Sequence, residues 1–194
     1  NLETVTQAEI FIAKNKGMGK ITGSIAINNF PNIKTDLDLL NRVFYVFRIL
    51  LRLLTEEEKD EKFFILLEKY LSILETDPYD EKKTDILTAG FLFKVLSEMG
   101  YRIEVEKCVY CEKKLLLENN YFSVARGGIL CGNCSGAEPR KMIISNESIK
   151  LIRIFLRNKL ENLNKVQVSR KESDQLKVIL KLTLDWISSS DVRP

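Results

Sequence analysis

The sequence contains no histidine. This absence excludes a nucleophile activated by histidine, a histidine general base and a histidine-ligated catalytic zinc, so the composition favours a protein that is not an enzyme. Long apolar runs are also lacking, because charged residues interrupt every hydrophobic stretch well before the roughly 20 residues that a membrane span needs. No segment has the order of residues of a signal peptide. We therefore predict a soluble, intracellular protein.

The residues that are present suffice for a sizeable hydrophobic core. Of the 194 residues, 45% are hydrophobic and 29% are charged, which is typical of one or two globular domains. The net charge of +3 is unevenly spread: residues 1–35 carry +2, 36–107 carry −5, 108–142 carry +2 and 143–194 carry +4. Such an asymmetry is compatible with a polyanionic partner, and equally with an ordinary solvated surface.

The first segment has the pattern of strands. Apolar and polar residues alternate in AEIFIA and again in KITGSIAI, and Gly17 and Gly19 lie in the connection. This pattern predicts a β-hairpin that ends before Pro31. A lone two-stranded hairpin is marginally stable, so we expect these strands to belong to a larger sheet or to pack on the next segment of the chain.

Three helices are predicted next, and three helices of this length form an α-helical bundle. Thr35 is a suitable N-cap for the run DLDLLNRVFYVFRILLRLL, in which the charged residues occupy a narrow arc, so we expect this helix to be central and largely buried. The second helix comes after the charged stretch 56–62 and contains KFFILLEKYLSIL. After the turn DPYDEKK, Thr84 opens a third helix, which Gly100 stops in the left-handed conformation.

Two more helices are predicted near the end of the chain. Ser145 caps one that runs to about Leu163, and Glu172 or Ser173 begins the other. On the first of these, a basic stripe lies beside the apolar face and consists of Lys150, Arg153 and Arg157. The stripe is either the solvated edge of an amphipathic helix or a surface that contacts phosphates.

All four cysteines lie in the segment CVYCEKKLLLENNYFSVARGGILCGNC, in two C-x-x-C pairs with nineteen residues between them. Each pair can present two thiolates to one ion, and YFSV, ARGG and ILC supply a strand, a turn and a return strand that bring the pairs together. Disulfides are disfavoured in an intracellular chain, and a redox C-x-x-C needs only one pair. The spacing therefore predicts one structural zinc per chain, held by Cys108, Cys111, Cys131 and Cys134.

These residues carry a resemblance to a known family. Leu96, Gly100-Tyr101, the first cysteine pair, Tyr121-Phe122-Ser123, Arg126-Gly127-Gly128 and the second pair resemble the RecO family of bacterial DNA-repair and recombination-mediator proteins. Upstream, Gly17-Met18-Gly19-Lys20-Ile21-Thr22 and Phe30-Pro31-Asn32 resemble the end of that family's OB-fold and its exit into the helical domain. The chain ends in LTLDWISSSDVRP, where many members have a more basic helix that contains histidine.

The resemblance implies a mainly α fold, a helical bundle with an inserted four-cysteine zinc ribbon, preceded by a remnant hairpin of an OB-fold whose first strands are absent. It divides the chain into strands of the incomplete OB-fold (1–34), a helical domain (35–107), a zinc ribbon (108–142) and helices that complete the helical domain (143–194). It also implies a nucleoid-associated accessory protein that binds and anneals single- and double-stranded DNA. The implied partners are RecR and the acidic tail of the single-strand-binding protein, through which it helps to load recombinase.

Charge and resemblance together give candidate DNA-binding residues at the hairpin tip and around the ribbon. They are Lys14, Lys16, Lys20, Lys113, Lys114, Arg126, Arg140 and Lys141. For the acidic tail, the Phe- and Leu-rich segment 84–99 with Lys94 is a candidate pocket wall, or simply core. The alternative function is a zinc-stabilised protein-interaction module without DNA affinity of its own.

Overall fold

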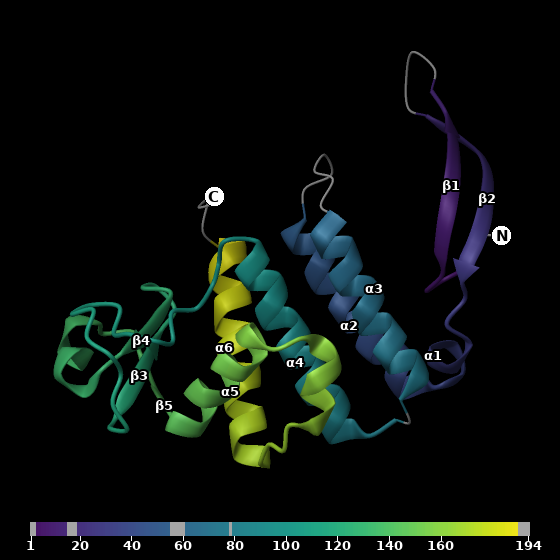
Figure 1. Ribbon diagram of the computed structural model, residues 1–194. Coiled ribbons are helices and arrows are strands. Elements are labelled where there is room, and N and C mark those ends of the chain that lie inside the picture. The colour runs from purple at the N-terminus through teal and green to yellow at the C-terminus, as the bar shows by residue number, and fades with distance from the viewer. Residues whose placement is uncertain (1–2, 15–18, 55–60, 78, 190–194) are drawn as a thin grey trace.

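The structure, a computed structural model, describes residues 3–14, 19–54, 61–77 and 79–189. Figure 1 shows three parts side by side: a projecting hairpin at one end, a helical body in the middle (residues 31–100 and 145–189), and a small subdomain with three short strands at the other end. We call this last part the cysteine subdomain (residues 101–144). The fold is mainly helical, as the sequence predicts.

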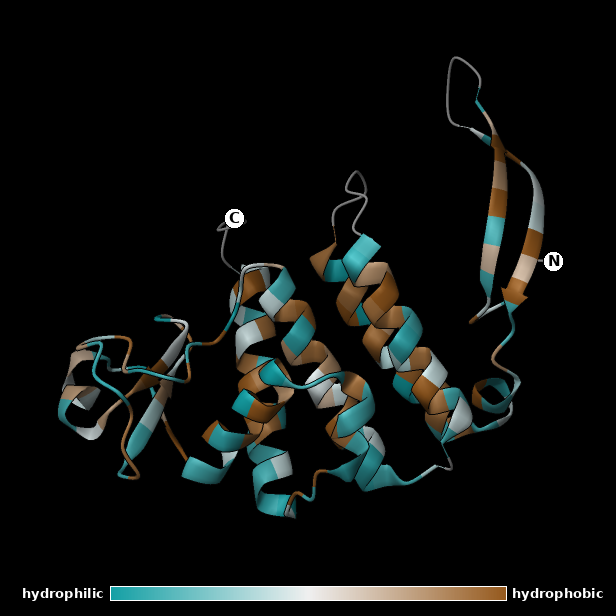
Figure 2. Cartoon of the chain, in the orientation of Figure 1, coloured by the Kyte–Doolittle hydropathy of each residue, from teal (hydrophilic) through white to brown (hydrophobic). Residues whose placement is uncertain are grey.

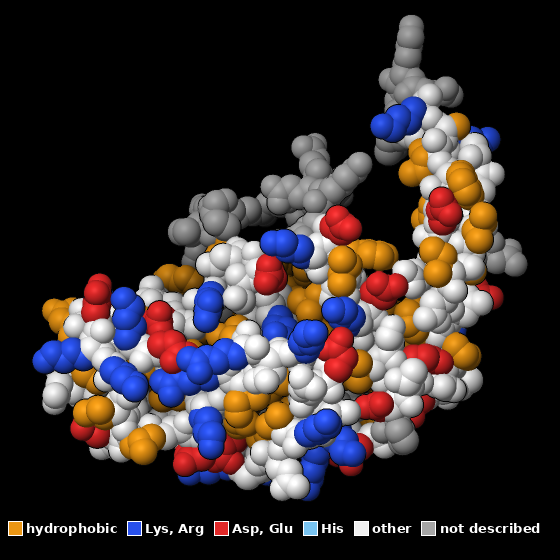
Figure 3. Space-filling view, in the orientation of Figure 1, with side chains coloured by type: hydrophobic (Ala, Val, Ile, Leu, Met, Phe, Trp, Pro, Cys, Tyr) orange, Lys and Arg blue, Asp and Glu red, His pale blue; other side chains and the backbone are white. Residues whose placement is uncertain are grey.

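The predicted hairpin is confirmed. β1 (Gln7–Ala13) and β2 (Lys20–Asn28) pair antiparallel. Within the described residues they pair only with each other, so of the two expected arrangements, a larger sheet or packing on the next segment, the larger sheet is not seen there. Figure 2 shows hydrophobic residues along both strands, and Figure 3 shows hydrophobic side chains on the surface of the hairpin. Six of them are between 44% and 64% exposed: Ile10, Phe11, Ile12, Ile21, Ile25 and Ile27. The base of the hairpin is attached to the helical body through buried Val5 and a hydrogen bond of 2.9 Å from Gln7 to Glu68. Lys34 of the helical body also donates to Glu3 and Thr6, at 3.1 and 3.0 Å.

A short helix that the sequence did not predict connects the hairpin to the helical body. α1 (Pro31–Thr35) comes directly after Phe30, which is buried and has a φ of 44°, an unusual conformation for a bulky residue. Both carboxylate oxygens of Glu75, in α3 (Glu61–Thr76), accept hydrogen bonds from the N–H groups of Asn32 and Ile33, at 2.9 and 3.0 Å. An acidic group at this position satisfies N–H groups that have no partner inside the helix, and it ties α1 to α3.

The next helix, α2 (Leu37–Leu53), begins later than predicted. Its N-cap is Asp36, whose carboxylate accepts hydrogen bonds from the N–H groups of Asp38 and Leu39. Thr35 instead ends α1, and its hydroxyl donates to the carbonyl of Pro31 at 3.0 Å. Thr and Asp are both common N-cap residues. Because Thr35 is the last residue of α1, Asp36 takes the N-cap position of α2.

The central helix is α4 (Glu81–Glu98), and the prediction that α2 is central is wrong. α2 buries one face, while its residues Leu37 and Leu51 are 71% and 80% exposed. In contrast, eleven residues of α4 are buried, because α3, α5 (Asn146–Arg157) and α6 (Arg170–Ser189) all pack against it. The polar residues of α4 in the core are small and bonded: the hydroxyl of Thr88 donates to a carbonyl one turn earlier and pairs with that of Tyr70.

The predicted start of α4 is wrong, and its predicted end is correct. Asp80 caps the helix, so it begins before Thr84, which is buried in its second turn. At the other end, Gly100 has a φ of 84°, and the N–H of Tyr101 donates to the carbonyl of Leu96 at 2.8 Å. This is the left-handed helix stop that the sequence predicts.

The last two helices are confirmed with changed ends. Ser145 caps α5 as predicted, but α5 ends at Arg157 and a 3₁₀ helix, η2 (Leu160–Lys165), carries Leu163 into the core. α6 begins at Arg170, two residues before the earlier of its two predicted starts. No helix in the described part of the chain is long and apolar enough to cross a membrane.

The cysteine subdomain contains the predicted strand, turn and return strand. β3 (Asn120–Ser123) pairs antiparallel with β4 (Gly128–Leu130), and β5 (Met142–Ile144), which was not predicted, adds a third strand on the other side of β3. The turn needs both of its glycines. Gly127 has a φ of 64°, and a Cβ on Gly128 would lie 2.6 Å from the carbonyl oxygen of Glu104.

Two side chains of the helical body hold the cysteine subdomain in place. The guanidinium of Arg153, on α5, donates two hydrogen bonds to the carbonyl of Val105, one of them through Nε at 2.8 Å. The amide of Gln175, on α6, accepts from the N–H of Ser145 at 2.9 Å and donates to the carbonyl of Ile143 at 3.1 Å. Gln175 therefore pairs with the edge of β5 much as a neighbouring strand would.

Candidate metal centre and nucleic-acid interface

The fold brings all four cysteines together. Cys108 and Cys111 lie in the turn that precedes β3, Cys131 comes directly after β4, and Cys134 lies in the 3₁₀ helix η1 (Gly132–Ala137). Their sulfur atoms all lie within 4.8 Å of one another, and none of them is in a disulfide. Two segments that are nineteen residues apart in the sequence thus supply one cluster of four thiols.

Backbone hydrogen bonds shape both C-x-x-C turns. The N–H of Cys134 donates to the carbonyl of Cys131 at 3.0 Å, and the N–H of Glu112, which has a φ of 59°, donates to the carbonyl of Cys108 at 2.9 Å. The N–H of Cys131 also donates to the sulfur of Cys108, at 3.4 Å. Bonds of this kind orient a thiolate toward a shared ion, so the two turns support each other.

The thiols of the cluster differ in their acidity. Burial acts to raise the pKa of Cys108, but hydrogen bonds from the backbone of Cys111, Cys131 and Tyr110 outweigh it and lower the pKa to about 6. For Cys134, burial, the three neighbouring thiols and the charge of Cys108 all raise the pKa, to about 12. Ionisation of Cys108 thus opposes ionisation of Cys134, and a bound cation relieves this repulsion.

The geometry of the cluster fits a tetrahedral ion. Four sulfur atoms at the usual zinc–sulfur bond length lie about 3.8 Å from one another. The sulfur atoms of Cys111 and Cys131 are 3.9 Å apart. With four sulfur ligands, the set is closed and leaves no position for a water molecule or a substrate, so an ion held here supports the fold and does not activate water.

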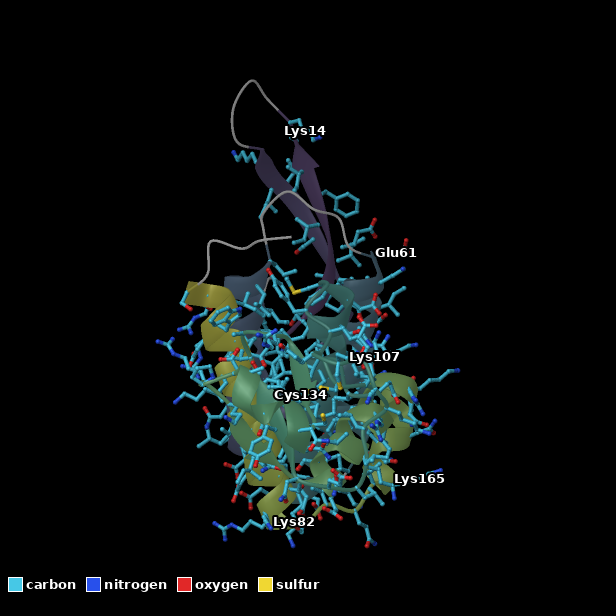
Figure 4. All side chains as sticks on the ribbon, turned by 90° about the vertical axis from the view of Figure 1, so that its left-hand side faces the viewer. Lys14, Glu61, Lys82, Lys107, Cys134 and Lys165 are labelled. Carbon is cyan, nitrogen blue, oxygen red and sulfur yellow. The ribbon has the colours of Figure 1, made fainter. Side chains whose placement is uncertain are left out.

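The predicted DNA-binding residues do not form one surface. Lys14 and Lys20 are exposed near the tip of the hairpin, and Lys16 lies outside the described residues. The other five belong to the cysteine subdomain: Lys113, Lys114, Arg126, Arg140 and Lys141. Figure 1 places these two groups at opposite ends of the molecule, and Figure 4 shows Lys14 far from Cys134.

Two of these cations make contacts inside the cysteine subdomain. Arg126 Nε lies 3.5 Å from a carboxylate oxygen of Glu138, and its guanidinium carbon lies 5.3 Å from the centre of the Tyr110 ring. Lys141 donates to the carbonyl of Glu138 at 3.0 Å, and its Nζ lies 5.7 Å from the centre of the Tyr121 ring. Arg126 and Lys141, which we predicted to bind DNA, therefore also stabilise the subdomain.

Two residues of the basic stripe on α5 contact the segment that leads into the cysteine turn. Arg153 binds the carbonyl of Val105, and its Nε lies 3.5 Å from the carboxylate of Glu106. Arg157 donates to the same carboxylate at 2.6 Å. Of the three stripe residues, only Lys150 forms no ion pair with described residues, and it is exposed. These contacts favour a structural role for the stripe over contact with phosphates.

Sequence reasoning missed a cleft in the helical body. The cleft has a volume of about 490 Å³ and lies between α2, α4 and α6, with leucines in its wall. In it, Asp85 forms ion pairs of 2.5 Å with both Arg42 and Lys177, while Arg52 and Lys181 form no ion pair with described residues. The lining comes from three separate parts of the sequence, so no local pattern could reveal it.

The comparisons with known proteins agree with this arrangement. The model of the family "Recombination protein O C terminal" matches residues 34–190. "DNA repair protein RecO" of Dehalococcoides mccartyi is 28% identical over 187 residues, which are 96% of this chain and 72% of that protein. The protein of the same name from Roseiflexus sp. is 24% identical over 193 residues, which are 100% of this chain and 67% of that protein. A third, from Halalkalibacterium halodurans, is 27% identical over 177 residues, which are 90% of this chain and 66% of that protein.

The fold and the site thus define a mainly helical protein with a four-cysteine subdomain, and its relatives are DNA repair proteins. The chain belongs to the RecO family.

Proposed function

We propose that the chain is a non-enzymatic DNA-repair accessory protein that binds and anneals single- and double-stranded DNA. In this role it helps to load recombinase onto strands coated by single-strand-binding protein, and its partners are RecR and the tail of the single-strand-binding protein. Family membership carries the proposal. The closed cysteine cluster supports a structural metal in place of a catalytic one. The proposed location is the cytoplasm, at the nucleoid.

The proposal includes one structural zinc per chain, held by the four cysteines, and a division of the chain after residues 34, 107 and 142. Close packing of α4 with α5 and α6 supports a single helical domain formed from the segments on either side of the zinc ribbon. The role of the zinc is to hold the ribbon's two turns together in a segment too small to bury a core of its own.

The DNA contacts belong to the lysines and arginines of the hairpin tip and the cysteine subdomain. Within the cysteine subdomain, Lys113, Lys114 and Arg140 are the best supported, because they are exposed and form no ion pair with described residues. Figure 3 shows Lys and Arg side chains over the cysteine subdomain and the neighbouring helices, interspersed with acidic ones. Such a mixed surface suits moderate, salt-sensitive binding of a phosphate backbone.

Replacing Lys113 and Lys114 together with alanine should weaken single-strand binding and reduce its salt dependence. Each lost phosphate contact lowers the slope of log K against log salt by about 0.7 on single strands, so the pair accounts for about 1.4. Gel-shift titrations at several salt concentrations measure the slope. The matched control is Lys82→Ala with Lys83→Ala, an exposed pair at the start of α4, away from the subdomain in Figure 4. Equal slopes for both double variants would remove these two lysines from the proposed DNA surface.

The alternative function, a protein-interaction module without DNA affinity, is supported by the cleft between α2, α4 and α6. Its leucine wall and the cations Arg52 and Lys181 suit an acidic peptide that ends in an apolar residue, the chemistry expected of the tail. Of the aromatic and leucine residues of 84–99 that we considered for this role, Leu92 lines this cleft. Phe91, Phe93 and Leu96 are core and at most 2% exposed. Lys94 lines a different, smaller pocket.

A variant with Arg52→Ala and Lys181→Ala should bind the acidic tail peptide at least about tenfold more weakly, because two charge-assisted contacts are lost. Calorimetry with the peptide measures the affinity. Lys94→Ala is the control and should bind as the parent does. If Lys94→Ala alone weakens binding, the tail docks in the smaller pocket. If DNA fails to bind at low salt while the peptide binds, the interaction-module function is the correct one.

A further inference from the structure

An exposed tyrosine stands between two of the cysteines. Tyr110 separates Cys108 from Cys111, and 56% of it is exposed. Its backbone cannot adapt freely, because the N–H of Val109 donates to the carbonyl of Ile129 at 2.9 Å and the turn is closed by the bond from Glu112 to the carbonyl of Cys108. An aromatic ring on a rigid turn, with more than half of its surface open, is poorly explained as core and suits contact with a ligand.

The Tyr110 ring already has a cation, Arg126, against it. The guanidinium carbon of Arg126 lies 5.3 Å from the centre of the Tyr110 ring, within the range of a cation–π contact. Arg126 is itself fixed, because it pairs with Glu138 and donates to the carbonyl of Ala137 at 3.4 Å. The ring is therefore held in one orientation before any ligand arrives, which lowers the entropic cost of binding.

A second pair of the same kind lies next to the first. Lys141 lies 5.7 Å from the centre of the Tyr121 ring and is bonded to the carbonyl of Glu138, the residue whose carboxylate holds Arg126. A continuous series of contacts thus links the Tyr110 ring to the Tyr121 ring through Arg126, Glu138 and Lys141. Aromatic rings alternating with cations are the common surface of single-strand-binding proteins, because bases stack on the rings while cations meet the phosphates.

We propose that Tyr110, backed by Arg126, is a stacking platform for an unpaired base of single-stranded DNA. The inference rests on the proposed DNA-binding function and adds to it a contact with bases. Bases inside a duplex are covered by their neighbours, so a ring on the protein surface can stack only on a base that is free. The platform therefore makes the cysteine subdomain favour single strands over duplexes, which lysine–phosphate contacts alone do not.

The test compares two ligands of equal length and charge, an oligothymidylate and an oligonucleotide of abasic sites. Tyr110→Ala should weaken binding of the oligothymidylate by about tenfold, the effect of one lost stack. It should leave binding of the abasic oligonucleotide, and the salt slope for both, unchanged, because no phosphate contact is removed. Tyr110→Phe keeps the ring and should bind as the parent does.

Two controls keep the result interpretable. Tyr79→Ala removes another exposed tyrosine, 39% exposed and outside the subdomain, and should have no effect. Metal content measured on Tyr110→Ala shows whether the subdomain is still folded. If it is folded and the two oligonucleotides are weakened equally, or not at all, the platform is refuted while the DNA-binding function stands. If the parent protein binds neither oligonucleotide at low salt, both the platform and the proposed function fail.

A fluorescence measurement tests the contact directly and does not depend on removing the ring. The chain has a single tryptophan, Trp186, so Trp186→Phe removes the tryptophan fluorescence of the parent protein. Tyr110→Trp, added to this variant, then places the single indole at the platform. Stacking on a thymine should quench this indole, whereas the abasic oligonucleotide should not. Equal fluorescence with both ligands, at concentrations where both are bound, would overturn the platform.

Discussion

Replacing Cys131 with serine should reduce the zinc content from about one equivalent per chain to almost none and unfold the cysteine subdomain. The reason is that the subdomain is small and its two turns are joined by the sulfur cluster, from which the substitution removes one of the four ligands. Structural zinc contributes roughly 10–16 kcal/mol in small zinc domains, far more than a few short strands can supply. Elemental analysis measures the metal, and hydrogen exchange measures the folding of β3 and β4.

The matched control is Ser135→Ala, beside Cys134. It removes a hydroxyl that donates to the carbonyl of Gly132 at 2.8 Å and leaves all four sulfur atoms in place, so it should keep its zinc. α4 should remain protected from exchange in both variants, because most of its buried contacts are with α3, α5 and α6. A parent protein that is purified without chelators and contains no metal, or whose cysteines are paired as disulfides, would contradict the zinc assignment.

The second large effect is expected in the centre of the helical body. Phe91→Ala should lower the free energy of unfolding by about 3–5 kcal/mol, because it removes a fully buried ring and leaves a cavity. Phe91 has no exposed surface, and its ring stacks on that of Tyr70 with centres 4.5 Å apart. Urea denaturation followed by circular dichroism measures the loss.

Phe64→Ala is the matched control, since Phe64 lies on α3 and is 54% exposed. It should change the free energy of unfolding by less than about 1 kcal/mol. A small effect of Phe91→Ala together with weaker binding of the acidic tail peptide would show that the aromatic residues of α4 form a partner site after all.

Sequence reasoning succeeded where one short segment determines the outcome. Gly100 stops α4 because its φ of 84° suits glycine, and Ser145 caps α5 because its hydroxyl reaches the N–H of Ser148 at 3.1 Å. The cysteine spacing likewise specifies two turns and a hairpin between them, and the structure brings the four sulfur atoms together. In each case the deciding contacts lie within a few residues or within one hairpin.

It failed where a distant part of the chain decides. Glu75 of α3 caps α1, so no residue near Pro31 in the sequence indicates that helix. For the same reason the sequence does not show that the N-cap of α2 is Asp36 and not Thr35. The number of neighbouring helices, not its own periodicity, makes α4 the central helix.

The candidate site shows the same limit. A charge count cannot distinguish Lys113, which is exposed and forms no ion pair with described residues, from Arg126, which is bound to Glu138, or from Arg157, which is bound to Glu106. Tyr110 drew no attention in the sequence because only the fold places a guanidinium on its ring.

The central position of α4 has a consequence for the protein during its synthesis. α4 is complete at Glu98, but the helices that cover much of its surface, α5 and α6, are translated only after the whole cysteine segment. At ribosomal rates of about 5–20 residues per second, its apolar side chains wait roughly 5–18 seconds until α6 is complete at Ser189. The nascent chain therefore has time to bind the proposed zinc before the helical body closes, and during that interval the apolar side chains of α4 are open to chaperones.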